Sequence, residues 1–370
     1  MILSLIQLIN FRRHINLSLN FSDKINYIVG INGIGKTSIL EAIYFICTTK
    51  GYKSKSDGEL LNFGEETFEV EGIFKNLVTH KARILYAAGN NRKNYLLDEK
   101  QVGKFHEIIG RFPVIILTPE DHNITQGLPA YRRKFVDSAI SQINKLYLET
   151  LLGYNKILRH RAALLYRIRE GGTKTLQEQL EVWNEKLVET GVEIINYRTR
   201  FIAEIYDYIK FSYQEIVKAE ETPDIQYSFL EDYDGTNTNS RFYELLASRR
   251  EEEIRRGTNQ VGPHRDDFIF TVNARNLRNF GSQGQHKTFQ IALKFAQYFY
   301  MKEKTGENPI FLLDDVFGEL DLNRAVRISE LLQQAGQVFI TLTDFAKFNF
   351  LKLRQEDSLI KFEAGETVGA

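Results

Sequence analysis

Hydrophobic and polar residues follow two different spacings along the chain. An apolar run, Ile25 to Val29, leads through a glycine-rich loop into a helix-like segment that ends near residue 46. Apolar and polar residues then alternate in 68–74 and 82–88, which predicts antiparallel strands, and the short run Val114 to Leu117 predicts a buried strand. The first third of the chain therefore predicts an α/β core joined to antiparallel strands.

The middle of the chain follows a helical spacing. Apolar residues recur mostly at steps of three and four between Ile140 and Ile168, and Gly171-Gly172 interrupts the series. A second series runs from Leu176 to Phe201. This spacing is typical of amphipathic helices and predicts a helical hairpin inserted into the fold.

The last third alternates between the two spacings. Strands are expected at 225–229, 268–272, 310–313 and 337–342, and helices are expected up to residue 256, at 285–302 and at 322–333. Such alternation favours a parallel sheet, and the predicted fold class is α/β. The predicted ranges are an N-terminal half with a β subdomain, a helical lobe, and a C-terminal half, at 1–128, 129–211 and 212–370.

Composition narrows the class of protein. The 370 residues are 43% hydrophobic and 26% charged, which is ordinary for a globular chain. The formal net charge is zero, so any binding to nucleic acid or membrane has to come from local patches. The single cysteine excludes an internal disulfide. The opening segment resembles a strand rather than an export signal, and no apolar stretch is long enough to span a bilayer, so we expect a cytoplasmic protein.

The glycine-rich loop carries the strongest chemical signal. Gly30 to Thr37 fits the pattern G-x-x-x-x-G-K-[ST] between a strand and a helix. Glycines let the backbone N–H groups surround phosphate oxygens, Lys36 would reach the β- and γ-phosphates of a nucleotide, and Thr37 would bind Mg²⁺. The alternative is an ordinary turn between a strand and a helix. The predicted nucleotide contacts here are Gly30, Ile31, Asn32, Gly33, Ile34, Gly35, Lys36, Thr37 and Ser38.

Two further segments complete the predicted site. An apolar strand ends in Asp314 and Asp315, where Asp314 would hold the metal and Asp315 would polarise the attacking water. Ser282, with Gly284 and Gln285, precedes a helix and could bind an anion at its N-terminus. The alternatives are a strand that runs into a turn and a capped helix without a ligand.

The order of these segments resembles the ATP-binding-cassette heads of the structural-maintenance-of-chromosomes (SMC) class, and within it the RecF family of bacterial recombination and replication-repair proteins. The matching segments are Asn10–Arg12, the phosphate loop, Pro129–Asp137, Val261–Asp267, Ser282–Gln285 and Asp314–Asp321. The resemblance implies an ATP-dependent homodimer that binds DNA and helps to place the RecA recombinase at gaps with RecO and RecR, with slow ATP turnover. It also implies that Ser282 acts across the dimer and that Arg12 approaches the phosphates.

The chain departs from the wider cassette pattern in four places. Gln283 stands where transporters carry glycine, and Asp315 replaces the usual glutamate. No histidine follows the strand that ends at Leu342, and Gln126 is only a weak candidate for the glutamine that links the two lobes. The first two departures suit RecF-like proteins and argue against a transporter subunit.

A basic stretch gives the predicted DNA interface. Between Tyr131 and Glu170, nine Lys or Arg residues stand against three Asp or Glu residues. Phosphate contacts depend little on sequence, so a basic helical arm suits DNA. A solvated helix face is the alternative, and the pair at 132–133 could equally be structural. The predicted DNA contacts are Arg132, Arg133, Lys134, Arg159 and Arg161.

The turn that contains His264 and Arg265 is open to two interpretations. These residues could lie near the dimer seam or DNA, or they could form a turn with one buried histidine. For the whole chain, three functions remain in competition: an ATP-controlled DNA clamp, a phosphotransferase for a small acceptor, and a recombination scaffold in which ATP is mainly structural.

Overall fold

The computed structural model describes residues 1–217, 220–231, 236–363 and 366–369. The chain forms two compact units. We call residues 1–121, 211–219 and 291–370 the head unit, and residues 122–210 and 220–290 the lobe unit. The two units are described separately below.

An antiparallel sheet forms one layer of the head unit, with strand order β2-β1-β4-β5-β6-β7. Its buried inward residues, such as Phe68 and Val70 on β4, alternate with partly exposed ones, which confirms the alternation seen in the sequence. The strands are β1 (Ile2–Phe11), β2 (His14–Asn20), β4 (Thr67–Lys75), β5 (Thr79–Ala87), β6 (Arg92–Leu97) and β7 (Lys100–Gln101).

The second sheet of the head unit has the order β15-β14-β3-β13-β12-β8, and all its pairings are parallel except that of β14 with β15. The predicted parallel sheet is therefore confirmed for 310–313 and 337–342, with an antiparallel edge. The strands expected at 225–229 and 268–272 pair antiparallel in a separate sheet instead. Its strands are β3 (Ile25–Gly30), β8 (Val114–Leu117), β12 (Ile310–Asp314), β13 (Val338–Leu342), β14 (Ser358–Glu363) and β15 (Glu366–Gly369). The sequence did not predict β14 or β15.

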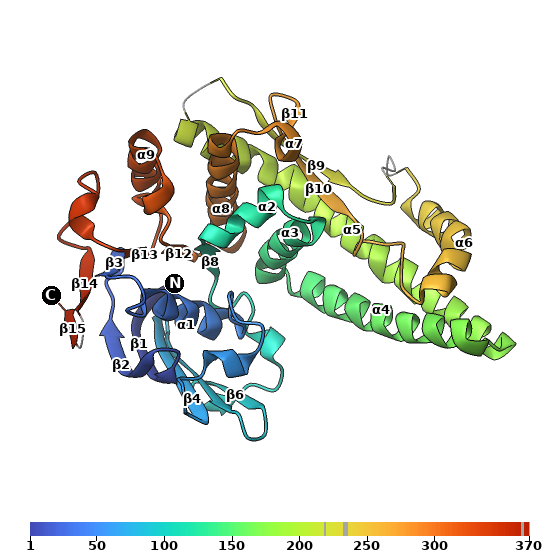
Figure 1. Cartoon of the computed structure of the whole chain (residues 1–370), viewed down its shortest axis with the longest axis horizontal. Coiled ribbons are helices and arrows are strands. Elements are labelled where there is room, and N and C mark those ends of the chain that lie inside the picture. The colour runs from blue at the N-terminus through green and yellow to red at the C-terminus, as the bar shows by residue number, and fades with distance from the viewer. Residues whose placement is uncertain (218–219, 232–235, 364–365, 370) are drawn as a thin grey trace. The chain divides into compact units, whose positions relative to one another are not determined.

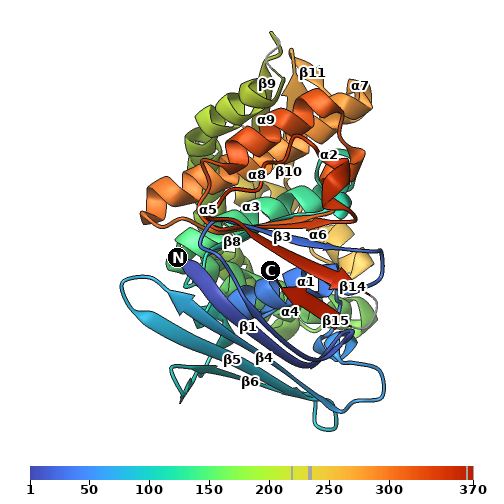
Figure 2. The ribbon, with the colours of Figure 1, turned by 90° about the vertical axis from the view of Figure 1, so that its left-hand side faces the viewer.

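Helix α1 (Lys36–Thr48) lies between the two sheets, as Figure 2 shows. It is apolar on most sides, and Ile39, Ile43 and Phe45 are fully buried in a core shared with both sheets. The opposite face of the parallel sheet is covered by α8 (Gln283–Thr305, of which 291–305 belong to the head unit) and α9 (Leu322–Leu332). Both faces of the central strands are therefore buried, which explains their continuous apolar sequences.

The lobe unit is mainly helical (Figure 1). Its long helices α4 (Lys145–Gly171) and α5 (Lys174–Val217, of which 174–210 belong to the lobe unit) form the predicted hairpin, and Gly171 ends α4 as expected. The remaining elements are α2 (His122–Gln126), α3 (Pro129–Ile143), α6 (Thr238–Arg256), α7 (Leu277–Phe280) and the sheet of β9 (Pro223–Ser228), β10 (Asp267–Val272) and β11 (Arg275–Asn276). The short 3₁₀ turns belong to the head unit instead: η1 (Asp57–Leu60), η2 (Phe105–Glu107), η3 (Pro119–Asp121), η4 (Phe317–Glu319) and η5 (Phe345–Lys347).

The lobe unit is larger than the predicted helical segment, since residues 220–290 belong to it rather than to the head. Ion pairs link residues 220–290 to the helical segment. Arg132 of α3 binds Asp267 of β10, and Arg161 of α4 binds Glu253 of α6. These contacts join segments that are more than ninety residues apart in sequence, and hydrophobic spacing does not reveal such pairings.

Candidate functional site

The phosphate loop has the backbone that its sequence predicts. Gly33 and Gly35 adopt φ values of +81° and +112°, a backbone conformation that residues other than glycine rarely adopt. At Gly30, a Cβ atom would lie 2.8 Å from the carbonyl oxygen of Phe362. The loop leads into α1, whose N-terminal N–H groups and dipole favour an anion. The loop thus forms a cradle that a Cβ would obstruct.

Lys36 is held within this loop. Its side chain is buried, and Nζ donates to the carbonyl oxygens of Gly30 at 2.6 Å and Ile31 at 3.0 Å. Burial lowers the pKa of Lys36, and the carboxylates of Asp315 and Asp314 oppose this shift. A cation therefore lies inside the glycine cradle and near both strand-end acids.

Asp314 connects the loop to the end of β12. Its Oδ1 accepts a hydrogen bond from the Thr37 hydroxyl at 2.8 Å and another from the Thr341 hydroxyl at 3.0 Å. Thr37 and Asp314 are 277 positions apart in the sequence, and the predicted meeting of the two segments is observed. The Asp314 carboxylate is almost fully buried at the carboxyl end of the parallel sheet.

The sequence did not predict two further partners of Asp314. The Tyr52 hydroxyl lies 3.2 Å from Oδ2, and the Lys53 ammonium lies 3.1 Å from the same atom. Burial, and then the Asp314 carboxylate, raises the pKa of Tyr52 far above its ordinary range, so the phenol stays protonated and donates. Both residues follow α1 in an irregular segment that matches no sequence motif.

Asp315 adopts a left-handed backbone conformation with φ +52°. Its N–H donates to the Thr341 hydroxyl at 2.9 Å, and the residue is exposed. Aspartate tolerates this conformation better than most residues that carry a Cβ. The backbone therefore offers a physical reason for Asp rather than Glu at this position.

The N-terminal hairpin also reaches the loop. Arg12, a predicted phosphate contact, is paired with Glu41 of α1. Its Nη2 and Nε atoms lie 2.8 and 2.9 Å from Glu41 Oε2. His14 lies closer to the loop, with Nε2 3.1 Å from the carbonyl oxygen of Gly35. A Cβ placed on Gly33 would lie 3.2 Å from Nη1 of Arg13. The structure thus adds Arg13 and His14 to the surroundings of the loop.

These residues fit Mg²⁺ with a nucleotide. Magnesium in phosphate sites is bound through one or two protein oxygens, water and phosphate oxygens. Thr37 and Asp314 supply the protein oxygens, and among the described residues no cluster of three His, Cys, Asp or Glu side chains offers a separate metal site. The ion would polarise the phosphates that the glycine cradle and Lys36 hold.

Ser282 belongs to the lobe unit and caps α8. Its Oγ accepts from the N–H of Gln285 at 3.2 Å, and its own N–H donates to the Gln285 side chain at 3.0 Å. This is a capping box, so the structural alternative for this segment is realised. Ser282 is nevertheless exposed at the start of a 23-residue helix, where its hydroxyl hydrogen stays available to a ligand. Gly284 follows in the first turn of the helix.

Two predicted DNA contacts are corrected by their burial. Arg132 is 3% exposed, and its guanidinium binds both oxygens of Asp267 at 2.6 and 2.9 Å. Arg161 is 1% exposed and binds both oxygens of Glu253 at 2.6 and 3.0 Å. Both side chains are enclosed by protein partners and cannot reach a DNA phosphate. They hold the lobe unit together instead.

The sequence contained a signal for these two arginines. On α4, Arg161 lies on the same helix face as Tyr154, Ile157 and Leu165, which are all buried. Arg132 likewise precedes Phe135 and Val136 on the buried face of α3. A charged residue on an apolar stripe indicates a buried ion pair, because an unpaired charge there would be costly.

The other three predicted DNA contacts lie nearer the surface. Arg133 is half-buried and donates to the carbonyl oxygen of Asp266 at 2.5 Å. Burial lowers the pKa of Arg133, and the nearby Arg198 acts in the same direction. Lys134 and Arg159 are exposed, and neither forms an ion pair with another described residue.

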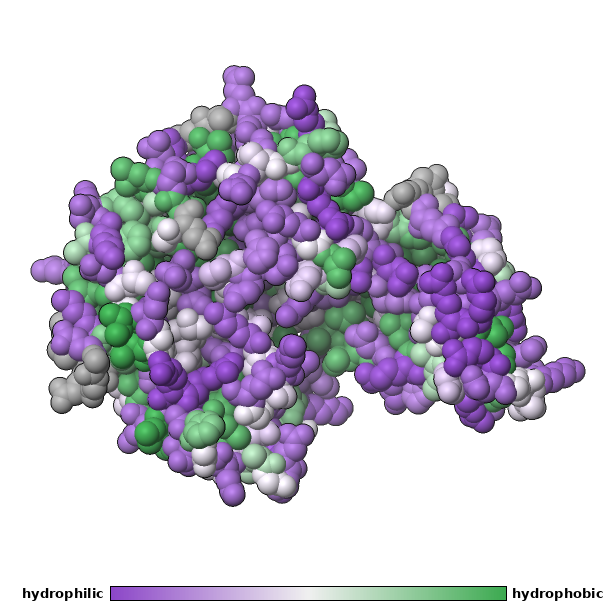
Figure 3. Space-filling view, in the orientation of Figure 1, coloured by the Kyte–Doolittle hydropathy of each residue, from purple (hydrophilic) through white to green (hydrophobic). Residues whose placement is uncertain are grey.

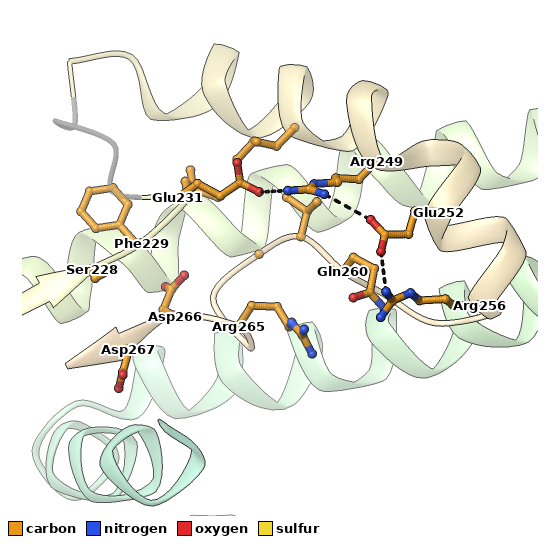
Figure 4. A pocket seen from close by; sticks show the side chains of 14 residues that line it. Ser228, Phe229, Glu231, Arg249, Glu252, Arg256, Gln260, Arg265, Asp266 and Asp267 are labelled. Carbon is orange, nitrogen blue, oxygen red and sulfur yellow. Dashed lines mark hydrogen bonds and ion pairs between the residues drawn. The ribbon is translucent and has the colours of Figure 1, made fainter. Parts of the chain in front are cut away.

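The turn with His264 and Arg265 lies beside a pocket of about 420 Å³ between β9, α6 and residues 260–267 (Figure 4). A hydrogen bond of 2.8 Å joins Nδ1 of His264 to the Tyr154 hydroxyl. Burial lowers the pKa of His264 to about 4. Burial raises the pKa of Asp266 to about 6, against the opposing effect of Arg198. Arg265 is exposed and lines the pocket, and no hydrogen bond or ion pair joins its side chain to another described residue.

Known proteins resemble this chain over most of its length. A family model of the RecF/RecN/SMC N-terminal domain matches residues 2–356. An SMC head domain bound to the C-terminal winged-helix domain of ScpA shares the fold, with a TM-score of 0.57, 14% identity, and coverage of 98% of this chain and 94% of that one. The fold and the site together define an ATPase head of the SMC-like class.

Closer relatives identify the family within this class. The DNA replication and repair protein RecF of Chloroherpeton thalassium is 38% identical over 355 residues, which is 92% of this chain and 95% of the relative. RecF of Salinibacter ruber is 34% identical, covering 93% of this chain and 85% of the relative. A structure of the recombination mediator protein RecF with ATP, in the RecFOR pathway, superposes with a TM-score of 0.88 and 31% identity, covering 100% and 97% of the two chains. The chain belongs to the RecF family.

No described helix combines the length and the apolar composition that crossing a bilayer requires.

Proposed function

We propose that this protein is an ATP-dependent DNA-binding protein of replication and recombinational repair. ATP with Mg²⁺ binds at the phosphate loop and Asp314, two copies close over the bound nucleotides, and the dimer clamps DNA. In this role it works with RecO and RecR to load the RecA recombinase at gapped DNA. Slow hydrolysis, with Asp315 polarising the water, resets the dimer.

One observation carries the proposal. The hydrogen bond between Thr37 and Asp314 joins the glycine cradle to the strand-end acid, which are the two halves of a phosphate-binding ATPase site. The relative whose structure contains ATP covers essentially the whole chain at 31% identity, and it supports ATP as the nucleotide.

The dimer is supported by the position of Ser282. The serine is exposed in a different compact unit from the phosphate loop, and its helix N-terminus can receive an anion. Phe280, two residues earlier, is 72% exposed, which places an apolar side chain beside the serine. A surface of this kind suits a protein partner, and we assign it to the nucleotide-bearing face of a second copy.

The DNA surface is placed on the exposed side of the lobe unit. On α4, Lys156, Arg159 and Arg167 are exposed and have no ion-pair partner among the described residues. Lys134 on α3 and Arg265 beside the pocket add two further exposed cations. Figure 3 shows mostly hydrophilic residues over the outer part of this unit. Free cations gain more from DNA phosphates than paired ones do, since no existing ion pair has to break.

The experiment for the dimer is sedimentation of the full chain with ATP and Mg²⁺, with ADP, and without nucleotide. We expect a dimer with ATP alone, and we expect Ser282→Arg to prevent the dimer while ATP binding by the monomer stays within twofold. A matched control is Ser240→Arg, an exposed serine on α6. Equal loss of ATP binding and dimerisation in Ser282→Arg would contradict a role for the serine across the dimer.

A further inference from the structure

The irregular segment between α1 and η1, residues 49–56, places a cation on the buried acid of the candidate ATP site. Lys53 Nζ lies 3.1 Å from Asp314 Oδ2, and Tyr52 donates to the same oxygen. The side chain of Asp314 is 3% exposed, and the described residues give it no second ion pair. Lys53 is therefore the counter-ion that compensates this carboxylate.

A magnesium ion would be drawn to the same carboxylate. Thr37 is already in hydrogen-bond contact with Asp314 Oδ1, so an ion held by the Thr37 hydroxyl would come close to Asp314. A divalent ion and an ammonium group repel each other strongly at such short range in a partly buried site. The two cations therefore compete for Asp314.

We propose that Lys53 is a built-in counter-ion of Asp314, which the magnesium of a bound nucleotide displaces, and that Glu120 receives the released ammonium group. This inference rests on the proposed ATP site. Glu120 Oε1 is already 3.7 Å from Lys53 Nζ, and its side chain is 57% exposed. The ammonium can therefore move toward solvent and keep an acidic partner throughout.

The backbone around Lys53 is anchored, which confines the exchange to the side chain. The N–H of Ser54 donates to Glu41 Oε1 at 3.3 Å, and the other oxygen of Glu41 holds Arg12. At Gly51 a Cβ atom would overlap Ser54 Oγ at 1.8 Å, so the turn is tight. Lys53 keeps a fixed base from which its long side chain can reach either acid.

The test measures the affinity for AMP-PNP, a non-hydrolysable ATP analogue, by calorimetry in EDTA and at increasing MgCl₂. Lys53→Met removes the counter-ion, so the bare Asp314 carboxylate would repel the phosphates in EDTA. We expect affinity in EDTA to fall about fivefold and the half-saturating Mg²⁺ concentration to fall about fivefold. Each change corresponds to about 1 kcal/mol, the upper end for a partly exposed ion pair.

Two matched variants separate the local contact from general charge. Lys55→Met removes the same charge two residues away, where the side chain is exposed and forms no ion pair with the described residues, and it should change neither quantity by more than about 1.5-fold. Lys53→Arg keeps the charge and should remain within twofold of the natural protein in EDTA.

Two results would overturn the inference. One is an equal Mg²⁺ midpoint in Lys53→Met and Lys55→Met. The other is weaker binding of AMP-PNP by Lys53→Met at saturating Mg²⁺, which would assign Lys53 to the nucleotide instead of Asp314. Failure of the proposed ATP site gives a different result, because the natural protein and a Lys36→Ala variant would then bind AMP-PNP equally poorly.

Discussion

Replacing Arg161 with methionine tests the assignment of this arginine to the interior of the lobe unit. The guanidinium makes four hydrogen bonds, two to Glu253 at 2.6 and 3.0 Å and one each to Asn184 and Asn259 at 2.7 Å. Arg161 and Glu253 are each 1% exposed, so solvent cannot compensate the carboxylate when its partner is removed. Methionine keeps most of the aliphatic stem, which limits the cavity.

Breaking a buried ion pair by removing one partner costs about 3–5 kcal/mol. We therefore expect Arg161→Met to lower the free energy of unfolding of the lobe unit by about 3 kcal/mol or more, because two asparagine side chains lose a partner as well. The double variant Arg161→Met, Glu253→Met removes both charges and should recover most of this loss. If Arg161 has only a structural role, the double variant should also bind DNA within twofold of the natural protein.

The assay is urea unfolding followed by tryptophan fluorescence. The single tryptophan, Trp183, lies on α5 next to Asn184, so it reports on the lobe unit directly. Arg159→Met, an exposed change two residues away, is the control and should stay within about 0.5 kcal/mol. A cost below about 1 kcal/mol for Arg161→Met, or an equal cost in the control, would contradict the assignment of Arg161 to a buried ion pair.

Three further predictions concern the site, the pH response and DNA. Asp315→Asn should lower ATP hydrolysis by at least about a hundredfold. ATP binding should stay within twofold, because asparagine also tolerates the left-handed backbone at φ +52°. An unchanged turnover number would exclude Asp315 from the chemistry. Burial favours the neutral form of His264 and lowers its pKa, so its contribution to the stability of the lobe unit is present above pH 6.5 and is lost as the pH falls toward 4. His264→Gln should therefore remove up to about 3 kcal/mol of this pH dependence in urea titrations of the lobe unit. An unaltered pH profile would count against this role of His264. The double variant Lys134→Gln, Arg159→Gln should weaken binding to duplex DNA. Since each cation would contact one phosphate, the slope of log K against the logarithm of the salt concentration should become shallower by about 2. An unchanged slope would place the DNA elsewhere.

The sequence predicted the phosphate loop and its meeting with the strand-end acid, for a local reason. The phosphate loop and the strand-end acid are each encoded by a few adjacent residues, and the carboxyl ends of parallel strands meet at one edge of a sheet. Strand alternation in 68–74 and the helical spacing in 140–168 also sufficed to predict β4 and α4. The meeting of Thr37 and Asp314 followed from these elements together.

The contacts that depend on tertiary packing could not be predicted in the same way. A count of positive charges in 131–170 does not distinguish Arg159, on the outer face of α4, from Arg161, which is buried two residues later. Arg198 is another buried arginine. It lies in the apolar stripe of α5, is 2% exposed, and binds Asp137 at 2.9 Å. Lys53 was missed because its partner lies 261 positions away and its own segment has no regular structure.

The most direct test of the proposed clamp is binding of the full chain to gapped, duplex and single-stranded DNA across a salt series, with ATP and Mg²⁺, with ADP, and without nucleotide. We expect tight, salt-sensitive binding that requires ATP. Binding that is equally strong without nucleotide, or no binding in any state, would contradict an ATP-controlled clamp even if Lys36 holds the nucleotide.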